Sequence, residues 1–419
     1  MPASLWRHRD FRLLWAGQTV SEVGTQVSFL AVPLVAIDIV HASTFGVGLL
    51  AAMQTLPFLL VGLPAGAWVD RMARRPVLIA ADIGRTVALG SIPAAWALSA
   101  LTLAQLYIVS LVAGILTVFF DVAYQSYLPV LVGHEHLVDG NAKLATSESG
   151  ARVVGPAVAG GLVSAVGAAN AVLADAASFV VSFATLLAIR TPEERPEAAP
   201  APRGRARRLK GEIAEGLRFV WREPRIRSVA GSTSTSNFFS VMAMAVLLVF
   251  LRRQLHLSAG RIGVLEALGS VGGIVGALAA GRLARRIGVG RTILWTIAVS
   301  GLGQMAYPLA TRATASILVV VGGVLTAGGA VAYNINQVSL RQALCPPRLL
   351  GRMNASVRFM VWGSMPIGGF VGGVLGSTIG LRPTLWVAAA GSLAAFGWIL
   401  FSPVPAVRTI PTPEELAGV

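Results

Sequence analysis

Apolar runs of about 20 residues recur along the whole chain, and this feature constrains its fold more than any other. A helix of about 20 residues crosses a bilayer core about 30 Å thick, so each run is long enough to span a membrane. By this measure the chain holds about twelve spans and is expected to be an all-α integral membrane protein. The spans lie near residues 11–40, 46–69, 76–98, 103–132, 148–166, 170–189, 228–250, 261–284, 292–310, 315–340, 356–379 and 383–401.

Composition favours a membrane protein over a nucleic-acid-binding protein. Hydrophobic residues make up 55% of the chain and charged residues 13%, and the mean hydropathy is +0.70. The formal net charge of +15 could bind phosphates. However, the basic residues fall mostly between the apolar runs, where charges orient a membrane protein. We therefore expect the lipid bilayer as a partner and no nucleic acid.

Arginine-rich connections alternate with connections that are almost free of basic residues, and this alternation orients the protein. The arginine-rich ends are expected to be cytoplasmic, and they hold Arg7, Arg9, Arg12, Arg71, Arg74, Arg75, Arg282, Arg285, Arg286, Arg291, Arg341, Arg348 and Arg352. The main exception is the group Arg252, Arg253 and Arg261, on the predicted outer side. Because the number of spans is even, we expect both termini in the cytoplasm and the protein in the cell membrane.

A charged segment without a spanning run joins the two halves. Its first part, from Thr191 to Arg205, is rich in proline and charge and predicts a solvent-exposed cytoplasmic linker. Apolar residues then recur at helical spacing, namely Leu209, Ile213, Leu217 and Val220. They predict an amphipathic helix on the membrane face, with a plain solvated helix as the alternative. The expected parts are an N-terminal bundle, a linker, a C-terminal bundle and a cytoplasmic tail, at residues 1–190, 191–227, 228–402 and 403–419.

Two stretches of the first half recur in the second half. "GAWVDRMARRP" from Gly66 is similar to "GRLARRIGVGR" from Gly281, although Arg285 stands opposite Asp70. A weaker pair places Gln125 opposite Gln337 and Asn141 opposite Asn354. Both repeats are six spans apart. Two repeated six-helix halves of parallel topology are typical of secondary transporters, whose substrate site lies between the halves.

The first of these stretches carries a family signature. Its residues Gly66, Asp70, Arg71, Arg74 and Arg75 match the pattern G-x-x-x-D-R/K-x-G-R/K-R/K, with Ala73 where glycine is usual. The chain therefore resembles the major facilitator superfamily, in which this loop joins helices two and three. "EGLRFVWREPRIR" and "GRMNASVRFMVWGSMPIGGFVGG" resemble the branch of enterobactin exporters and macrolide-efflux-type permeases. The resemblance implies twelve transmembrane helices in two pseudo-symmetric halves.

The same loop is expected to act as a gate. Alternating access requires two states that differ by a few kcal/mol, so a latch of charged hydrogen bonds can bias their equilibrium. Asp70 is expected to be the acceptor of that latch, with an arginine or a helix N-terminus as donor. The resemblance implies that the loop stabilises the outward-facing form. The alternative for Arg71, Arg74 and Arg75 is that they only orient the protein.

Ionisable residues inside a span are costly and point to function. Glu22 in the first span and Asp121 in the fourth lie deeper than the charged residues near the span ends. We expect them to form a polar pathway that binds a cationic substrate group or carries a proton. Structural carboxyls that hydrogen-bond across helices are the alternative. Asn237, in the polar run "GSTSTSNFF" of the seventh span, is a further candidate cavity residue.

Other charged residues of the spans receive less weight. Glu148, Asp82 and Arg358 fall near predicted cytoplasmic ends, where snorkelling or capping is expected. Asp82 can also pair with Arg85, which follows three residues later on the same helix face. Asp175 in the sixth span is also a candidate for function.

Glycines and a proline in the fifth span form a relaxed version of the antiporter motif of drug/proton antiporters. "GPAVAGG" places three residues, instead of two, between the pair Gly155–Pro156 and the pair Gly160–Gly161. The fourth span also lacks the arginine that typical drug/proton antiporters carry there. A role in close helix packing explains the glycines equally well.

The leading functional hypothesis is a secondary active exporter of amphipathic small molecules, coupled to protons and monomeric. The alternatives are a receptor or scaffold without flux, and an importer or uniporter of a small metabolite. No nucleotide-binding G-x-x-x-x-G-K-[ST] motif is present, so ATP-driven transport would need a separate subunit. No nucleophile, base and orienting group can be assembled from the sequence, so an enzyme is not expected. The lone Cys345 and the scattered histidines predict no metal site and no cofactor.

Overall fold

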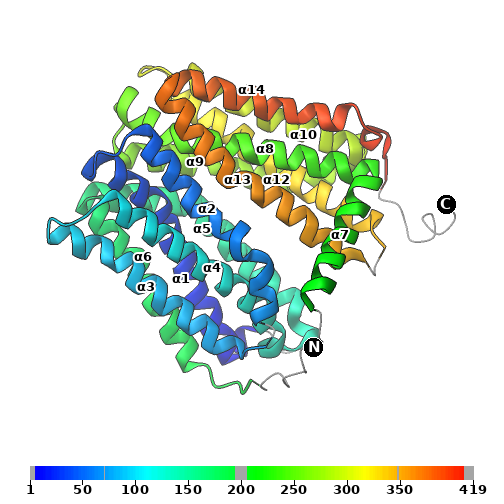
Figure 1. Ribbon diagram of the computed structural model, residues 1–419, viewed down its shortest axis with the longest axis horizontal. Helices are drawn as coiled ribbons and strands as arrows, with labels where there is room; N and C mark the ends of the chain where they lie inside the picture. Colours follow the sequence, from blue (N-terminus) through cyan, green and yellow to red (C-terminus); the bar gives the residue numbers. More distant parts are fainter. Residues whose placement is uncertain (1–4, 70, 194–204, 347–348, 410–419) are drawn as a thin grey trace. The chain divides into compact units, whose positions relative to one another are not determined.

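The computed structural model describes residues 5–69, 71–193, 205–346 and 349–409, and these residues form helices and no strand. Two compact units are present, one made of residues 1–199 and 257–267 and the other of residues 200–256 and 268–419. The helices of the first half are α1 (Arg9–Leu34), α2 (Thr44–Val69), α3 (Arg74–Ala97), α4 (Leu103–Val132), α5 (Leu137–Val166) and α6 (Ala168–Ala188) (Figure 1).

The second half opens with the additional helix α7 (Arg205–Arg222). Its other helices are α8 (Pro224–Val249), α9 (Ala259–Ile287), α10 (Val289–Gln304), α11 (Ala306–Leu309), α12 (Ala315–Leu344), α13 (Leu350–Thr378) and α14 (Leu381–Leu400). The start of α9 groups with the first unit, which the sequence division at residues 190 and 228 did not anticipate. Residues 404–408 of the expected tail pack on the second unit, because Val404 is fully buried and the Gly290 amide donates to the Val407 carbonyl.

Eleven helices of the described residues are long and apolar enough to cross a membrane. The twelfth expected span, 292–310, corresponds to α10 and α11, which are separated at Met305. Its sixteen-residue first helix is too short for a bilayer by itself, whereas α10 and α11 together match the expected length.

The same helix pairing occurs in both units. In the first unit α1 packs on α5 and α6, and α3 packs on α4 and α6. In the second unit α8 packs on α13 and α14, and α10 packs on α12 and α14. Both α1 and α8 continue into a π-helical turn, Val35–Ile39 and Phe250–Gln254. His41 and His256 follow these turns with positive φ values of 53° and 55°. The repeat therefore extends to backbone detail that the sequence comparison missed.

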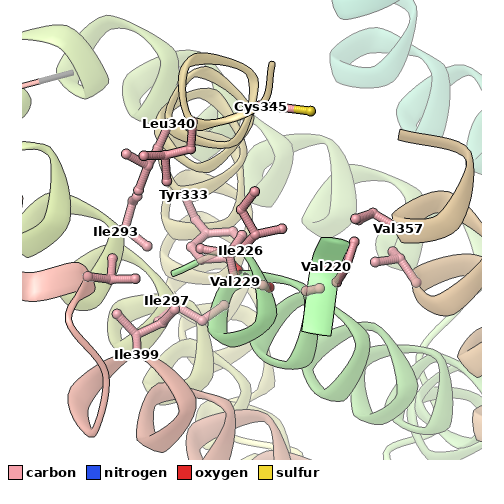
Figure 2. Close-up of a cluster of buried hydrophobic side chains, with 14 of the residues drawn as sticks. Val220, Ile226, Val229, Ile293, Ile297, Tyr333, Leu340, Cys345, Val357 and Ile399 are labelled. Carbon is pink, nitrogen blue, oxygen red and sulfur yellow. Dashed lines mark hydrogen bonds between the residues drawn. The ribbon is translucent and has the colours of Figure 1, made fainter. Parts of the chain in front are cut away.

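Each unit has its own apolar core. In the second unit, Val220 of α7 is fully buried beside Ile226 and Val229 of α8 (Figure 2). Gly216 of α7 lies against the backbone of Arg352 at the start of α13, where an added Cβ would approach the carbonyl oxygen to 2.5 Å. The end of α7 is therefore packed on protein, and neither expected alternative, a membrane-surface helix or a solvated helix, describes this part of it.

Candidate functional site

The first unit contains a polar pocket of about 160 Å³ between α1, α4 and α5. Its lining residues are Gln18, Thr19 and Glu22 of α1, Tyr124 of α4, and Asn141, Leu144, Ala145, Ser147 and Glu148 of α5. A polar space of this size can hold several water molecules or a small charged group. The pocket is the candidate functional site because it places two carboxyls in helices of membrane-spanning length.

Glu22 reaches the pocket because of its position on α1. Gln18 lies four residues earlier on the same helix face, and its amide Nε2 donates a 3.3 Å hydrogen bond to Glu22 Oε1. Ser21 and Gly24, on the opposite face, are buried against the bundle. The sequence predicted that Glu22 faces a polar path, and the structure places its side chain in this pocket.

α5 brings the second carboxyl. Asn141, Leu144 and Glu148 recur at helical spacing along one face of this helix. Glu148 forms a 2.7 Å ion pair with Arg152, which lies one turn further along. This pairing offsets one of the two negative charges of the pocket. Glu22 is the pocket carboxyl that forms no ion pair among the described residues.

Two further contacts shape the pocket. The indole Nε1 of Trp15 on α1 donates a 2.8 Å hydrogen bond to the hydroxyl of Ser147 on α5, which ties the two helices together. The Tyr124 hydroxyl is buried and has no hydrogen-bond partner among the described residues. A buried hydroxyl without a partner can bind a water molecule or a polar ligand group.

Sequence reasoning missed Glu148 as a pocket residue. It was expected to snorkel or cap at a helix end, since the fifth apolar run begins only at residue 148. α5 instead begins at Leu137, because its first turns are polar and still helical. The helical spacing of Asn141, Leu144 and Glu148 was the signal that could have revealed this face.

The other two predicted cavity residues lie elsewhere. Asp121 is half-buried on α4, one turn before Tyr124, and is not among the lining residues of the pocket. Asn237 is half-buried on α8 and belongs to the second unit. The structure therefore brings Glu22 together with Glu148, and it does not bring Asp121 or Asn237 to this pocket.

The predicted gating loop is described except for its central residue. Asp70 lies outside the described residues. Gly66 is half-buried near the end of α2. Among the described residues, no atom beyond its chain neighbours and its own helix backbone lies within 4 Å of the position that a Cβ would take there. Arg71 is exposed in the turn, where its amide donates to the Trp68 carbonyl at 3.1 Å.

The remaining two arginines of the loop are held by a residue that the sequence placed in the flexible linker. The backbone amides of Arg74 and Arg75, at the start of α3, donate to the Glu193 carboxylate at 2.6 and 3.0 Å. The Glu193 side chain is only 7% exposed and lies 3.6 Å from the Arg74 guanidinium. A carboxylate is stabilised at a helix N-terminus by free amides and by the helix dipole. Glu193 therefore caps α3.

A second carboxylate holds the chain just before Glu193. Asp10 Oδ2 accepts hydrogen bonds from the Arg190 amide at 3.0 Å and from the Thr191 amide at 2.8 Å. The Arg75 guanidinium also donates 2.9 Å bonds to the carbonyls of Leu186 and Leu187 at the end of α6. The expected solvent-exposed linker thus does not begin at Thr191, because its first residues are fastened to α1 and α3.

The glycine motif of α5 lies at two close contacts. A Cβ at Gly155 would approach Gln26 of α1 to 2.4 Å, and one at Gly160 would approach the Ala259 carbonyl of α9 to 2.7 Å. The Pro156 carbonyl would lie 2.2 Å from a Cβ at Gly263, whereas Gly161 faces open space. Three of the four predicted residues are thus placed where helices approach closely.

Among the described residues, no group of three or more histidines, cysteines, aspartates or glutamates is arranged to hold a metal ion.

Comparison with known proteins identifies the family. The model of the family described as transmembrane secretion effector matches residues 2–414. The multidrug efflux pump Tap of Mycolicibacterium fortuitum is 25% identical over 383 residues, which cover 89% of this chain and 90% of Tap. The enterobactin exporter EntS of Escherichia coli is 29% identical over 404 residues, which cover 94% of this chain and 90% of EntS.

Solved structures show the same fold. A bacterial homologue of the iron transporter ferroportin in an inward-facing state has a TM-score of 0.74 at 20% identity, covering 94% of this chain and 98% of its own. The nucleoside transporter NupG has a TM-score of 0.73 at 10% identity, covering 93% and 98%. This protein is a membrane-embedded transporter of a small-molecule substrate rather than an enzyme, and it belongs to the transmembrane secretion effector family of the major facilitator superfamily.

Proposed function

We propose that this protein is a secondary active exporter of amphipathic small molecules that is driven by a proton gradient. The observation that carries the proposal is the acidic pocket in which Glu22 lies beside Glu148 between membrane-spanning helices. The relatives support the direction of transport and the kind of substrate, because one is a multidrug efflux pump and another an enterobactin exporter. We further propose a monomer in the cell membrane with both termini in the cytoplasm.

Glu22 is the proposed coupling group. A carboxylate in the bilayer interior is stabilised either by a bound proton or by a cationic group of the substrate. Binding of one therefore favours release of the other, and this exchange links the two flows. Gln18 orients the carboxyl through its hydrogen bond, while the Tyr124 hydroxyl provides a partner for water or substrate.

The remaining predicted residues have secondary roles in this proposal. Asp70 is the acceptor of a latch that biases the equilibrium between the inward-facing and outward-facing states. Asp121 and Asn237 contribute polar groups along the path of the substrate. Gly155, Pro156 and Gly160 allow the close helix contacts that a moving bundle requires.

The proposal is tested with inside-out vesicles and a panel of lipophilic cationic compounds. The Glu22→Gln variant should still exchange substrate across the membrane but lose accumulation driven by a pH gradient. Glu135→Gln is the matched control, because the Glu135 side chain is 83% exposed and lies outside the pocket. It should accumulate substrate as the wild type does.

The outcome separates the alternatives. Gradient-driven accumulation at the wild-type rate in Glu22→Gln would contradict proton coupling through this residue. Movement of the panel only down its own gradient in the wild type would indicate a uniporter, and no movement of any compound would favour a scaffold.

A further inference from the structure

A second group of ionisable side chains is buried in the first unit, apart from the pocket. Asp82 and Arg85 of α3 and Asp175 of α6 are 0%, 5% and 1% exposed. They lie where α3 and α6 pack on each other and α6 packs on α1. All three belong to helices of membrane-spanning length, so water cannot compensate their charges.

Asp82 and Arg85 form an ion pair. Arg85 Nη2 donates to Asp82 Oδ1 three residues away on the same helix. The guanidinium also lies between two aromatic rings, 4.3 Å from the centroid of Phe120 and 4.1 Å from that of Phe179. The pairing that the sequence allowed is therefore present, but the pair is buried within the bundle and Asp82 does not snorkel. The charges of Asp82 and Arg85 therefore neutralise each other.

Asp175 has no such partner. Among the described residues it forms no ion pair, and the Ser178 hydroxyl donates to its Oδ1 at 3.2 Å. α1 closes the space beside it, because a Cβ at Gly24 would lie 2.8 Å from Asp175 Oδ1 and 2.2 Å from the Ser178 hydroxyl. The carboxyl is therefore enclosed by tightly packed helices.

The charged groups around Asp175 do not supply a second cation. Arg85 interacts with it from α3 but already pairs with Asp82, and Glu22 on α1 adds a negative charge. On α5, which also packs on α6, Glu148 pairs with Arg152. Within the cluster, two carboxyls thus face a single guanidinium.

Charge balance decides the state of the cluster. With both carboxyls ionised, the bundle interior would hold an uncompensated negative charge, which costs several kcal/mol in a region of low dielectric. The cluster therefore lacks one positive charge, and a single bound proton supplies it.

We infer that Asp175 binds a proton within the bundle of the first unit, while Asp82 stays ionised as the partner of Arg85. This proton site is distinct from the Glu22 pocket and does not depend on the proposed export function. The two sites are still electrostatically linked, because the charges of Glu22 and Asp175 interact. Release of the Asp175 proton would place a second negative charge near Glu22 and favour proton uptake there.

Infrared spectroscopy of the purified full-length protein in liposomes tests this site near neutral pH. A protonated carboxyl has a C=O stretching band separate from that of a carboxylate, and the band shifts in D₂O. The wild type should show this band, and Asp175→Asn should lose one carboxyl's share of it. Asp139→Asn is the control, because Asp139 is a 48% exposed residue paired with Lys143. It should leave the band unchanged, and an unchanged band in Asp175→Asn would overturn the inference.

Thermal unfolding provides a second, independent readout. Asparagine has the shape and charge of a protonated aspartate, so the Tm of Asp175→Asn near neutral pH should lie within about 3 °C of the wild-type value. Because the folded wild type holds a proton that the unfolded chain releases, its Tm should fall relative to Asp175→Asn as the pH rises.

Parallel pH profiles of wild type and Asp175→Asn, or failure of Asp175→Asn to fold, would each contradict a neutral Asp175. Neither measurement requires transport. The export proposal can therefore fail in the vesicle assay while the proton site stands, and the reverse also holds.

Discussion

The two units share their helix pairing but differ in the chemistry of their interiors. α10 and α14 occupy the places in the second unit that α3 and α6 occupy in the first. At the contacts of α10 in the second unit, Gln304 donates to the hydroxyls of Ser240 and Ser392 at 3.1 and 2.8 Å. At the α3–α6 contact of the first unit, the corresponding interior contains Asp82, Arg85 and Asp175.

This difference shows that this helix contact does not require buried charge. The second unit builds the same arrangement with uncharged hydroxyl and amide groups, which cost little to bury when they are hydrogen-bonded. The charges of the first unit are therefore additional to the architecture, and we attribute them to proton binding. The following predictions test this contrast, in order of decreasing effect.

The largest effect is expected from Arg85→Met in the first unit. Removal of the guanidinium leaves two buried carboxyls without a cation and should lower the free energy of unfolding by about 3–5 kcal/mol. The matched change in the second unit, Gln304→Leu, removes only neutral hydrogen bonds and should cost about 1 kcal/mol. Unfolding of the purified variants in detergent measures both. Equal losses in the free energy of unfolding would show that removing the guanidinium costs no more than removing the neutral hydrogen bonds.

A smaller effect is expected from the gating loop, where the halves differ again. Asp70 of the first half stands opposite Arg285 of the second in the repeated stretch. Asp70→Asn should leave expression and insertion normal but reduce transport at least about tenfold, equivalent to about 1.4 kcal/mol, because it weakens the latch. Arg285→Gln should transport at close to the wild-type rate. Normal flux in Asp70→Asn at normal expression would contradict a gating role for Asp70.

The smallest effect compares one acidic side chain in each unit. Glu193→Gln removes the carboxylate that caps α3 and should lower stability by about 1 kcal/mol. Glu215 of α7 pairs with Arg352 in the second unit, but both side chains are substantially exposed. Glu215→Gln should therefore cost less than about 0.5 kcal/mol. Thermal unfolding of the two variants side by side checks the order, and a greater loss for Glu215→Gln would refute the capping role of Glu193.

Much of the fold could be predicted because the signal for a membrane span is local. The apolar runs located the spans, and the stretches from Gly66 and Gly281 revealed the repeat. Predictions failed where polar residues continue a helix, as in the first turns of α5, since hydropathy alone does not recognise them. For the same reason, Glu148 was not predicted as a lining residue of the pocket.

Depth within a span selected one residue that the structure places in the pocket. Glu22 was selected because a short carboxylate in the first span cannot reach bulk water along lipid, and it lines the pocket. Depth could not rank Asp175 above Asp121, because the partners of a buried carboxyl come from other helices. For Asp175 those neighbours are Gly24 of α1 and Arg85 of α3.

The sequence by itself therefore determined the approximate positions of the spans, the two-fold repeat and the family signature. These properties depend on residue type and on spacing within one segment. Only the tertiary structure decided which charges meet. Asp10 and Thr191, or Glu193 and the start of α3, are more than a hundred residues apart in the chain. Such contacts depend on how the helices pack, and the hydropathy of a single segment does not predict which other segments will contact it.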